Sequence, residues 1–489
     1  MTATVHRTFS SLIPEGDRHP YRTGAWRPQV REWDDDDLEC VEGSIPADLD
    51  GLYVRNTENP LVPALERYHP FDGDGMLHAV RLAGGKARYR NRFVPTTALA
   101  QELAAGAPLY AGITEDPRRS QHPGWGARGG MKDASSTDVI VHRGRVLSTF
   151  YQCGDAYAFA AETMEPLGPE PWVPQDTGIS AHPKVCEHTG ELHYFRYSKQ
   201  APYMHYGVVD ARGARVHDVP VALPGPRLPH DMALGRRHVV LNDFPIFWDP
   251  DLLQRGVHRP RYDPRLPSRF AVLPRRGRAD ELRWFEAGAT YVLHFTNVFE
   301  DGDELVLDGY AQADPMPRPQ PERHGEYAWL MRQIDLASLR PTLRRWRMNL
   351  VTGACSEENL SPTITEFPTI NPRFAGLRNR HVWSMTAPEG WFMFDGILHT
   401  DLETGAEESF KYEPGVYASE VAVAPRGERE DDAWVVTYVM DTVRDLSECH
   451  IFAASDVAAG PVARLRLPER IASGTHATWA SGAALRAPA

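Results

Sequence analysis

The stretch TNVFEDGDELVLDGY, residues 296–310, places two runs of apolar and aromatic residues on either side of the polar turn EDGDE. Such runs favour extended backbone, and Gly with Asp between them is typical of a hairpin. Five further stretches share this order of strand, polar turn and strand. They are HAVRLAGGKARYRNRFV (78–94), TDVIVHRGRVLSTFY (137–151), PKVCEHTGELHYFRY (183–197), YGVVDARGARVHDVPV (206–221) and WFMFDGILHTDLETGAEESFKY (391–412). Hairpins over almost the whole chain predict an all-β protein.

The length of the chain favours a β-propeller. A blade of four strands takes roughly 40–70 residues, so a chain of this length accommodates about seven blades. No linker divides the sequence, so we expect one domain over residues 1–489, with residues 1–40 as an N-terminal extension and 41–489 as the propeller. The best helical pattern is PTTALAQELAAGAPL (95–109), with Thr96 or Thr97 as its N-cap.

Composition excludes several classes of partner. A net charge of −13 argues against nucleic acid, because phosphate binding needs a basic face. The five cysteines lie far apart and form no C-x-x-C, so we expect neither a disulfide framework nor a zinc knuckle, and a cytoplasmic location. No apolar run reaches the ~18–20 residues that span a bilayer. For peripheral membrane contact the candidate is FPIFWDPDLLQRG (244–256), although packing of this segment into the core is the favoured interpretation.

Four of the 20 histidines stand out by their apolar or small neighbours: His182, His230, His294 and His476. Burying an unpartnered imidazole costs about 1–3 kcal/mol, so such residues require hydrogen-bond partners or a metal. In a propeller the inner strands converge on the axis, which would bring these distant segments together. Four imidazoles without a carboxylate ligand suit iron(II). The alternative is that each is an ordinary structural histidine.

Two glutamates lie in apolar surroundings and are candidates to accept the second N–H of a metal-bound imidazole. They are Glu366 in TITEFPTINPRF and Glu420 in GVYASEVAVAP. The three histidines of GISAHPKVCEHTGELHYF (178–195) do not form a site by themselves, because His188 and His193 belong to a hairpin. Only His182 of this group is a candidate ligand.

Several segments, taken in order, resemble the carotenoid cleavage oxygenase family. They are RNTENP (55–60) with HPFDGDGMLHAVRL (69–82), SAHPKV (180–185) with TGELHYF (189–195), PHDMAL (229–234), HFTNVFEDGDELVLD (294–308), EFPTINPRFAG (366–376) and GTHATW (474–479). The resemblance runs from about residue 40 to the C-terminus. It implies a seven-bladed β-propeller with a helical and loop dome over a non-haem iron(II) on the central axis.

The resemblance also implies roles for individual residues. The four iron ligands would be His182, His230, His294 and His476. Glu366 and Glu420 would orient His294 and His476. A third glutamate of the family falls on Tyr151 or Gln152 here, which is a departure, and we expect Gln152 to accept the N–H of His230 instead.

The segment KDASSTDV (132–139) retains the threonine that lies near the open iron positions in the family, so Thr137 is expected to act in catalysis. Lys132, just upstream, is expected to be solvated.

The expected function is cleavage of a carbon–carbon double bond by dioxygen, with iron(II) as cofactor and a lipophilic alkene as partner. Relatives that cleave stilbenes hold the phenol with a lysine and a tyrosine, which fall here on Phe150 or Tyr151 and near Ile113. Their absence favours an apocarotenoid over a hydroxystilbene. The alternatives are a stilbene or phenylpropanoid dioxygenase, an iron-dependent retinoid isomerase, and a propeller that serves only as a binding scaffold. Oligomeric state is left open.

Overall fold

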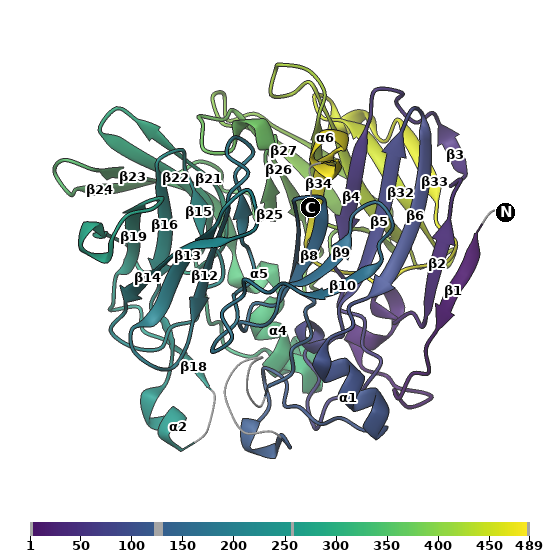
Figure 1. Cartoon of the computed structure of the whole chain (residues 1–489), viewed down its shortest axis with the longest axis horizontal. Helices are drawn as coiled ribbons and strands as arrows, with labels where there is room; N and C mark the ends of the chain where they lie inside the picture. Colours follow the sequence, from purple (N-terminus) through teal and green to yellow (C-terminus); the bar gives the residue numbers. More distant parts are fainter. Residues whose placement is uncertain (1–2, 122–130, 256–258, 487–489) are drawn as a thin grey trace.

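Seven antiparallel β-sheets surround a common axis in the computed structural model (Figure 1). The structure describes residues 3–121, 131–255 and 259–486. This arrangement confirms the predicted seven-bladed propeller. The quoted stretch 296–310 forms the hairpin of β21 and β22, in which Asp301 pairs with Glu304 across a turn that begins at Gly302. Gly302 has φ +62°, which glycine adopts without a steric penalty.

The first three blades have the following strand orders. The first is β1 (Thr4–Thr8), β2 (Arg31–Asp35), β6 (Lys86–Phe93), β5 (Met76–Ala83), β4 (Gly51–Arg55) and β34 (Ala477–Ser481). The second is β10 (Pro166–Pro169), β9 (Tyr157–Ala160), β8 (Arg145–Thr149) and β7 (Asp138–His142). The third is β11 (Lys184–Val185), β12 (Leu192–Tyr197), β13 (Tyr203–Val209) and β14 (Arg215–Ala222).

The remaining four blades continue around the ring. The fourth is β15 (Ala233–Leu234), β16 (His238–Asp243), β19 (Ser268–Pro274) and β20 (Arg283–Ala287), and the fifth is β21 (Val292–Asp301), β22 (Glu304–Gln312), β23 (Pro341–Asn349) and β24 (Cys355–Asn359). The sixth is β25 (Glu366–Thr369), β26 (His381–Thr386), β27 (Gly396–Asp401) and β28 (Glu407–Lys411). The seventh is β29 (Val416–Ala418), β31 (Ala433–Asp441), β32 (Leu446–Ala453), β33 (Ala463–Arg466) and β3 (Cys40–Gly43), and β30 (Ala422–Pro425) also pairs with β31.

Strands from the two ends of the chain close the ring twice. In the first blade β34 pairs with β4, so that Ala477 lies opposite Arg55. In the seventh blade β3 pairs with β33. The expected extension of residues 1–40 contributes β1 and β2 to the outer edge of the first blade. The proposed division at residue 40 stays a prediction.

Short helices and loops cover one end of the ring (Figure 1). Helix α1 (Thr97–Ala105) begins where the sequence predicts, because the Thr96 hydroxyl accepts the Leu99 N–H at 3.0 Å. Helices α4 (Ala328–Ile334) and α5 (Leu336–Leu339) pack apolar side chains against phenylalanines of the inner strands. The other helices are α2 (Pro250–Gln254), α3 (Pro321–His324) and α6 (Gly482–Leu485), and β17 (Ile246–Trp248) with β18 (Pro260–Tyr262) forms a separate ribbon.

The expectation of a solvated Lys132 is wrong. Its Nζ is buried and lies 2.8 Å from Asp74 Oδ1 and 3.2 Å from Glu102 Oε2. The chain passes under α1 here, and the two carboxylates, themselves buried, compensate the charge.

The apolar residues of 244–256 lie mainly in the core. Ile246 and Trp248 are buried, and Phe247 packs under the guanidinium of Arg227 at 5.2 Å. Residue 256 lies outside the described part of the chain. Core packing therefore explains Ile246 and Trp248, whereas Leu252 and Leu253 of the short helix Pro250–Gln254 are only partly buried, and a peripheral membrane contact stays a prediction. No helix among the described residues is both long enough and apolar enough to span a membrane.

Candidate metal centre

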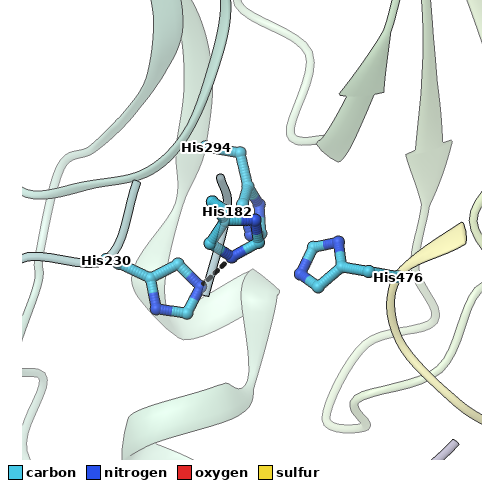
Figure 2. A group of neighbouring side chains, drawn as sticks. All are labelled: His182, His230, His294 and His476. Carbon is cyan, nitrogen blue, oxygen red and sulfur yellow. Dashed lines mark hydrogen bonds between the residues drawn. The ribbon is translucent and has the colours of Figure 1, made fainter. Parts of the chain in front are cut away.

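The four histidines singled out in the sequence come together on the axis, at the same end of four innermost strands (Figure 2). His182 lies two residues before β11, His230 three residues before β15, His294 within β21 and His476 directly before β34. Innermost strands of a propeller start at the axis, so residues from four blades meet there. One nitrogen from each ring lies within 4.8 Å of one nitrogen from each of the others.

This spacing fits a single metal ion. Metal–nitrogen bonds are about 2.1 Å long. In an octahedral arrangement, two ligand nitrogens at 90° then lie about 3.0 Å apart and two at 180° about 4.2 Å apart. The Nε2 atoms of His182 and His230 are 3.1 Å apart. Nε2 of His294 is buried and forms no hydrogen bond with a described residue, so a donor atom aimed at the centre has no protein partner. The donor set and its geometry therefore suit a divalent transition metal.

Burial keeps most of this group in the neutral form that metals bind. The pKa values of His182, His230 and His294 lie well below the usual range, first because the rings are buried and then because the neighbouring imidazoles repel a second charge. Burial is the largest single influence on His476 and opposes its charge, but the carboxylates around it, Glu420 foremost, together outweigh burial and raise the pKa of that imidazole. A metal would displace the proton from His476.

Three carboxylates from the remaining three blades hold the histidines and the backbone beside them. Glu366 Oε2 lies 2.6 Å from His294 Nδ1, and Glu420 Oε2 lies 3.2 Å from His476 Nδ1. Each of these oxygens also accepts a backbone N–H, from Phe367 at 2.5 Å and from Ala477 at 2.6 Å. These contacts fix the tautomer in which Nε2 faces the centre.

Asp138 is the third carboxylate, and the sequence analysis missed it. Asp138 is the first residue of β7. Its Oδ2 lies 3.5 Å from the ring Nδ1 of His182 and accepts the backbone N–H of the same residue at 3.2 Å. Burial raises the pKa of Asp138 to about 6. Asp138 directly precedes the apolar run Val-Ile-Val, so the criterion that identified Glu366 and Glu420, an acid in apolar surroundings, could also have identified Asp138. Each of the seven innermost strands thus supplies one histidine or one acid.

His230 is the exception, because it forms no ion pair with a carboxylate in the described part of the chain. Its ring lies 5.9 Å from that of Tyr151. Gln152 is buried, and its Oε1 accepts no hydrogen bond from a described residue. The expected hydrogen bond from His230 to Gln152 is therefore not formed in this structure.

Two residues at the centre have a strained backbone. His182 and Phe367 have φ values of +61° and +56°, a left-handed conformation that non-glycine residues rarely adopt. The carboxylates described above accept the N–H of both residues, Asp138 from His182 and Glu366 from Phe367. The same acids thus orient the imidazoles and stabilise the unusual turns.

Histidines of the centre line two cavities. One, of about 60 Å³, lies under the dome and is lined by apolar side chains together with Thr137, Glu58, Gln333 and Thr475. Its apolar lining is Phe71, Leu293, Ile334, Leu336, Leu339, Phe367 and Phe392. The other, of about 790 Å³, is lined by His182, His294 and His476 and has walls of mixed polar and apolar side chains, where Lys184 pairs with Asp231 at 2.7 Å.

Comparison with known proteins identifies the family of the chain. The family model described as retinal pigment epithelial membrane protein matches residues 26–481. The chain is 30% identical to a carotenoid 9,10(9',10')-cleavage dioxygenase of Crocus sativus, over 94% of this chain and 88% of that protein. It is 29% identical to lignostilbene-alpha,beta-dioxygenase isozyme III of Sphingomonas paucimobilis, over 95% and 97% of the two chains.

Among solved structures, the lignostilbene dioxygenase of Pseudomonas brassicacearum superposes with a TM-score of 0.81 at 26% identity, covering 95% of this chain and 99% of that one. The family match spans nearly all of the propeller and includes every histidine and acid of the centre. The chain therefore belongs to the carotenoid cleavage oxygenase family, the family of the retinal pigment epithelial membrane protein.

Proposed function

We propose that this protein is a non-haem iron(II) dioxygenase that cleaves a carbon–carbon double bond of an apocarotenoid or a related conjugated alkene into two carbonyl products. The observation that carries the proposal is a cluster of four buried imidazoles, of which His230, His294 and His476 line an apolar cavity. Three of the four imidazoles have lowered pKa values. Relatives named as carotenoid and lignostilbene dioxygenases support the reaction type.

The four imidazoles would hold iron(II), which supplies activation of dioxygen beside the bound alkene. The protein's own side chains do the rest. Phe367 and Phe392 line the cavity and present flat apolar surface to a conjugated chain. Leucines and Ile334 of α4 and α5 exclude water from it. Thr137 lines the same cavity, and we propose that it limits where dioxygen and substrate approach the histidines.

We propose an apocarotenoid as the substrate because this chain lacks a phenol-binding lysine and tyrosine at the positions where stilbene-cleaving relatives are expected to carry them. Phe150 and Tyr151 form a small apolar cluster with Ala134 and Ala181, against which Ile113 packs. Lys132 is engaged by two carboxylates. No lysine amine lines the apolar cavity within the described residues. A stilbene is the second candidate, because the Tyr151 phenol lies beside His230.

The test is metal analysis followed by turnover. Protein reconstituted anaerobically with iron(II) is expected to hold one iron per chain and to consume one dioxygen per alkene cleaved. The His294→Ala variant is expected to hold none. His205→Ala is the matched control, because His205 lies in β13 and pairs with Asp218 away from the axis.

Panels of apocarotenoids and stilbenes, analysed for carbonyl products, distinguish the alternatives. Product formation without dioxygen uptake would identify an isomerase. Absence of iron after reconstitution, together with unimpaired ligand binding by His294→Ala, would identify a binding scaffold and refute the proposal.

A further inference from the structure

Glu58 is a buried acid beside the four-histidine group that the proposed reaction does not use. Its backbone follows β4 and is held by a bridge between Glu58 and Gly75. Two residues earlier, the Asn56 N–H donates to the His476 carbonyl at 2.8 Å. The side chain of Glu58 is only 1% exposed. The strand pairing that places His476 at the axis therefore also places Glu58 there.

The Glu58 side chain faces the apolar cavity that His230, His294 and His476 also line. Apart from these histidines, most of the lining is leucine, isoleucine and phenylalanine. A carboxyl group in such a wall is costly unless its oxygens are hydrogen-bonded. Only one of the two oxygens has a protein partner, as the contacts of Thr475 show.

Glu58 Oε1 and the Thr475 hydroxyl are 2.8 Å apart, and the same hydroxyl lies 3.1 Å from the Thr137 carbonyl. A hydroxyl carries one proton. If that proton goes to the Thr137 carbonyl, which can only accept, the bond to Glu58 needs a proton on Oε1. Burial raises the pKa of Glu58 to about 8, in agreement with such a proton.

Glu58 Oε2 is buried and accepts no hydrogen bond from any described residue. Whether Oε1 carries a proton or the group is ionised, Oε2 has free lone pairs and acts as an acceptor. The partner it lacks is thus a donor inside the cavity. Thr137, Gln333 and Thr475 also line the cavity, but Glu58 Oε2 is the one side-chain oxygen among these four that is buried without a partner in the described part of the chain.

We propose that Glu58 is a specificity-determining residue whose Oε2 accepts a hydrogen bond from a hydroxyl group of the substrate. The inference rests on the proposed function and narrows its substrate to alkenes that carry an alcohol or a phenol near the double bond. A site built to bind a hydroxyl discriminates strongly against analogues that lack one, because its buried acceptor stays unpaired.

Two probe pairs test this on iron-loaded protein kept anaerobic so that nothing turns over. The first is trans-4-hydroxystilbene against trans-stilbene, and the second is retinol, a donor, against retinal, which only accepts. Dissociation constants come from fluorescence titration. The wild type is expected to bind the hydroxyl member at least tenfold more tightly in one pair.

The variants separate substrate contact from a structural role. Glu58→Met is expected to bring the two members of that pair within about twofold of each other. Glu58→Gln is expected to keep the preference, because its amide N–H₂ bonds to Thr475 and its oxygen faces the cavity. Glu430→Gln is the control, since Glu430 accepts two backbone N–H groups and lines neither cavity.

Lack of preference in the wild type for both pairs, or a preference that survives in Glu58→Met, overturns the assignment. The wild-type comparison needs no variant and holds even if Glu58→Met does not fold. Iron content and dioxygen uptake are measured on the same preparations. Failure of the binding pattern with both of these intact refutes the role of Glu58 alone, whereas absence of iron refutes the proposed function.

Discussion

Replacing Glu366 by glutamine is expected to weaken metal binding by the four histidines about 10–100-fold, the usual effect of losing a carboxylate that supports a ligand. Glu366 is fully buried, with Oε2 2.6 Å from His294 Nδ1. Glutamine keeps an acceptor at this position but removes the negative charge that makes the imidazole a stronger ligand. Since tenfold in affinity is about 1.4 kcal/mol, the expected loss is about 1.4–2.7 kcal/mol.

The same substitution is expected to leave the metal-free protein nearly as stable, within about 1 kcal/mol. Burial raises the pKa of Glu366 to about 8, so without metal the group is largely neutral at pH 7, as glutamine is. The amide oxygen still accepts the Phe367 N–H. Oε1 of Glu366 has no partner among the described residues, so replacing it by an amide nitrogen breaks no bond.

The assay is an anaerobic titration of iron(II) or cobalt(II) against a competing chelator, with thermal unfolding of the metal-free protein measured in parallel. Glu430→Gln again serves as the control, because it changes a buried glutamate outside the centre. An affinity for Glu366→Gln within twofold of the wild type would refute the reasoning. So would an equal loss in the control.

Three further predictions concern stability. Lys132→Met leaves the carboxylates of Asp74 and Glu102 buried without their cation. Denaturant titration is expected to show that the variant loses about 3–5 kcal/mol of unfolding free energy. A variant as stable as the wild type would contradict the ion cluster. Burial raises the pKa of Asp72 from the usual 3.8 to about 8, so its contribution to stability is complete below about pH 4 and is lost as the pH rises from there to about 8. Between pH 5 and 8 the melting temperature should therefore fall more in the wild type than in Asp72→Asn, and parallel curves would contradict this. Gly178 has φ +73°, and in Gly178→Ala the new Cβ would lie 2.3 Å from the Gly154 carbonyl oxygen. Calorimetry should therefore show a loss above about 2 kcal/mol in unfolding free energy. An unchanged melting temperature would show that the backbone adapts.

Local chemistry made much of the fold predictable. The turn at Gly302 follows from the Gly and Asp between two apolar runs, and the N-cap at Thr96 follows from a hydroxyl before an alanine-rich run. The four histidines were identifiable because each lies in a context that is costly for an unpartnered imidazole. Their meeting point followed from the resemblance to a propeller family, since spacing along the chain does not encode it.

The errors concern contacts between distant segments. Lys132 was expected to be solvated because lysine is rarely buried, and its burial depends on Asp74 and Glu102 from other segments of the chain. Asp138 was missed because a third glutamate was sought near Gln152, whereas the acid that faces His182 begins β7. Such pairings are set by how blades pack around the axis, which no local pattern specifies.

The pairing of β34 with β4 has a consequence for the order of events during synthesis. The fourth histidine, His476, precedes β34 directly and reaches the axis only when that strand joins the first blade. A nascent chain has to keep the first blade without its innermost strand from Phe93 to Ala477, while more than 380 further residues are made. Metal therefore cannot guide the early stages of folding, and its uptake reports that the ring is complete. Contacts of such large sequence separation also slow folding, so acquisition of metal by a new chain should lag behind its translation.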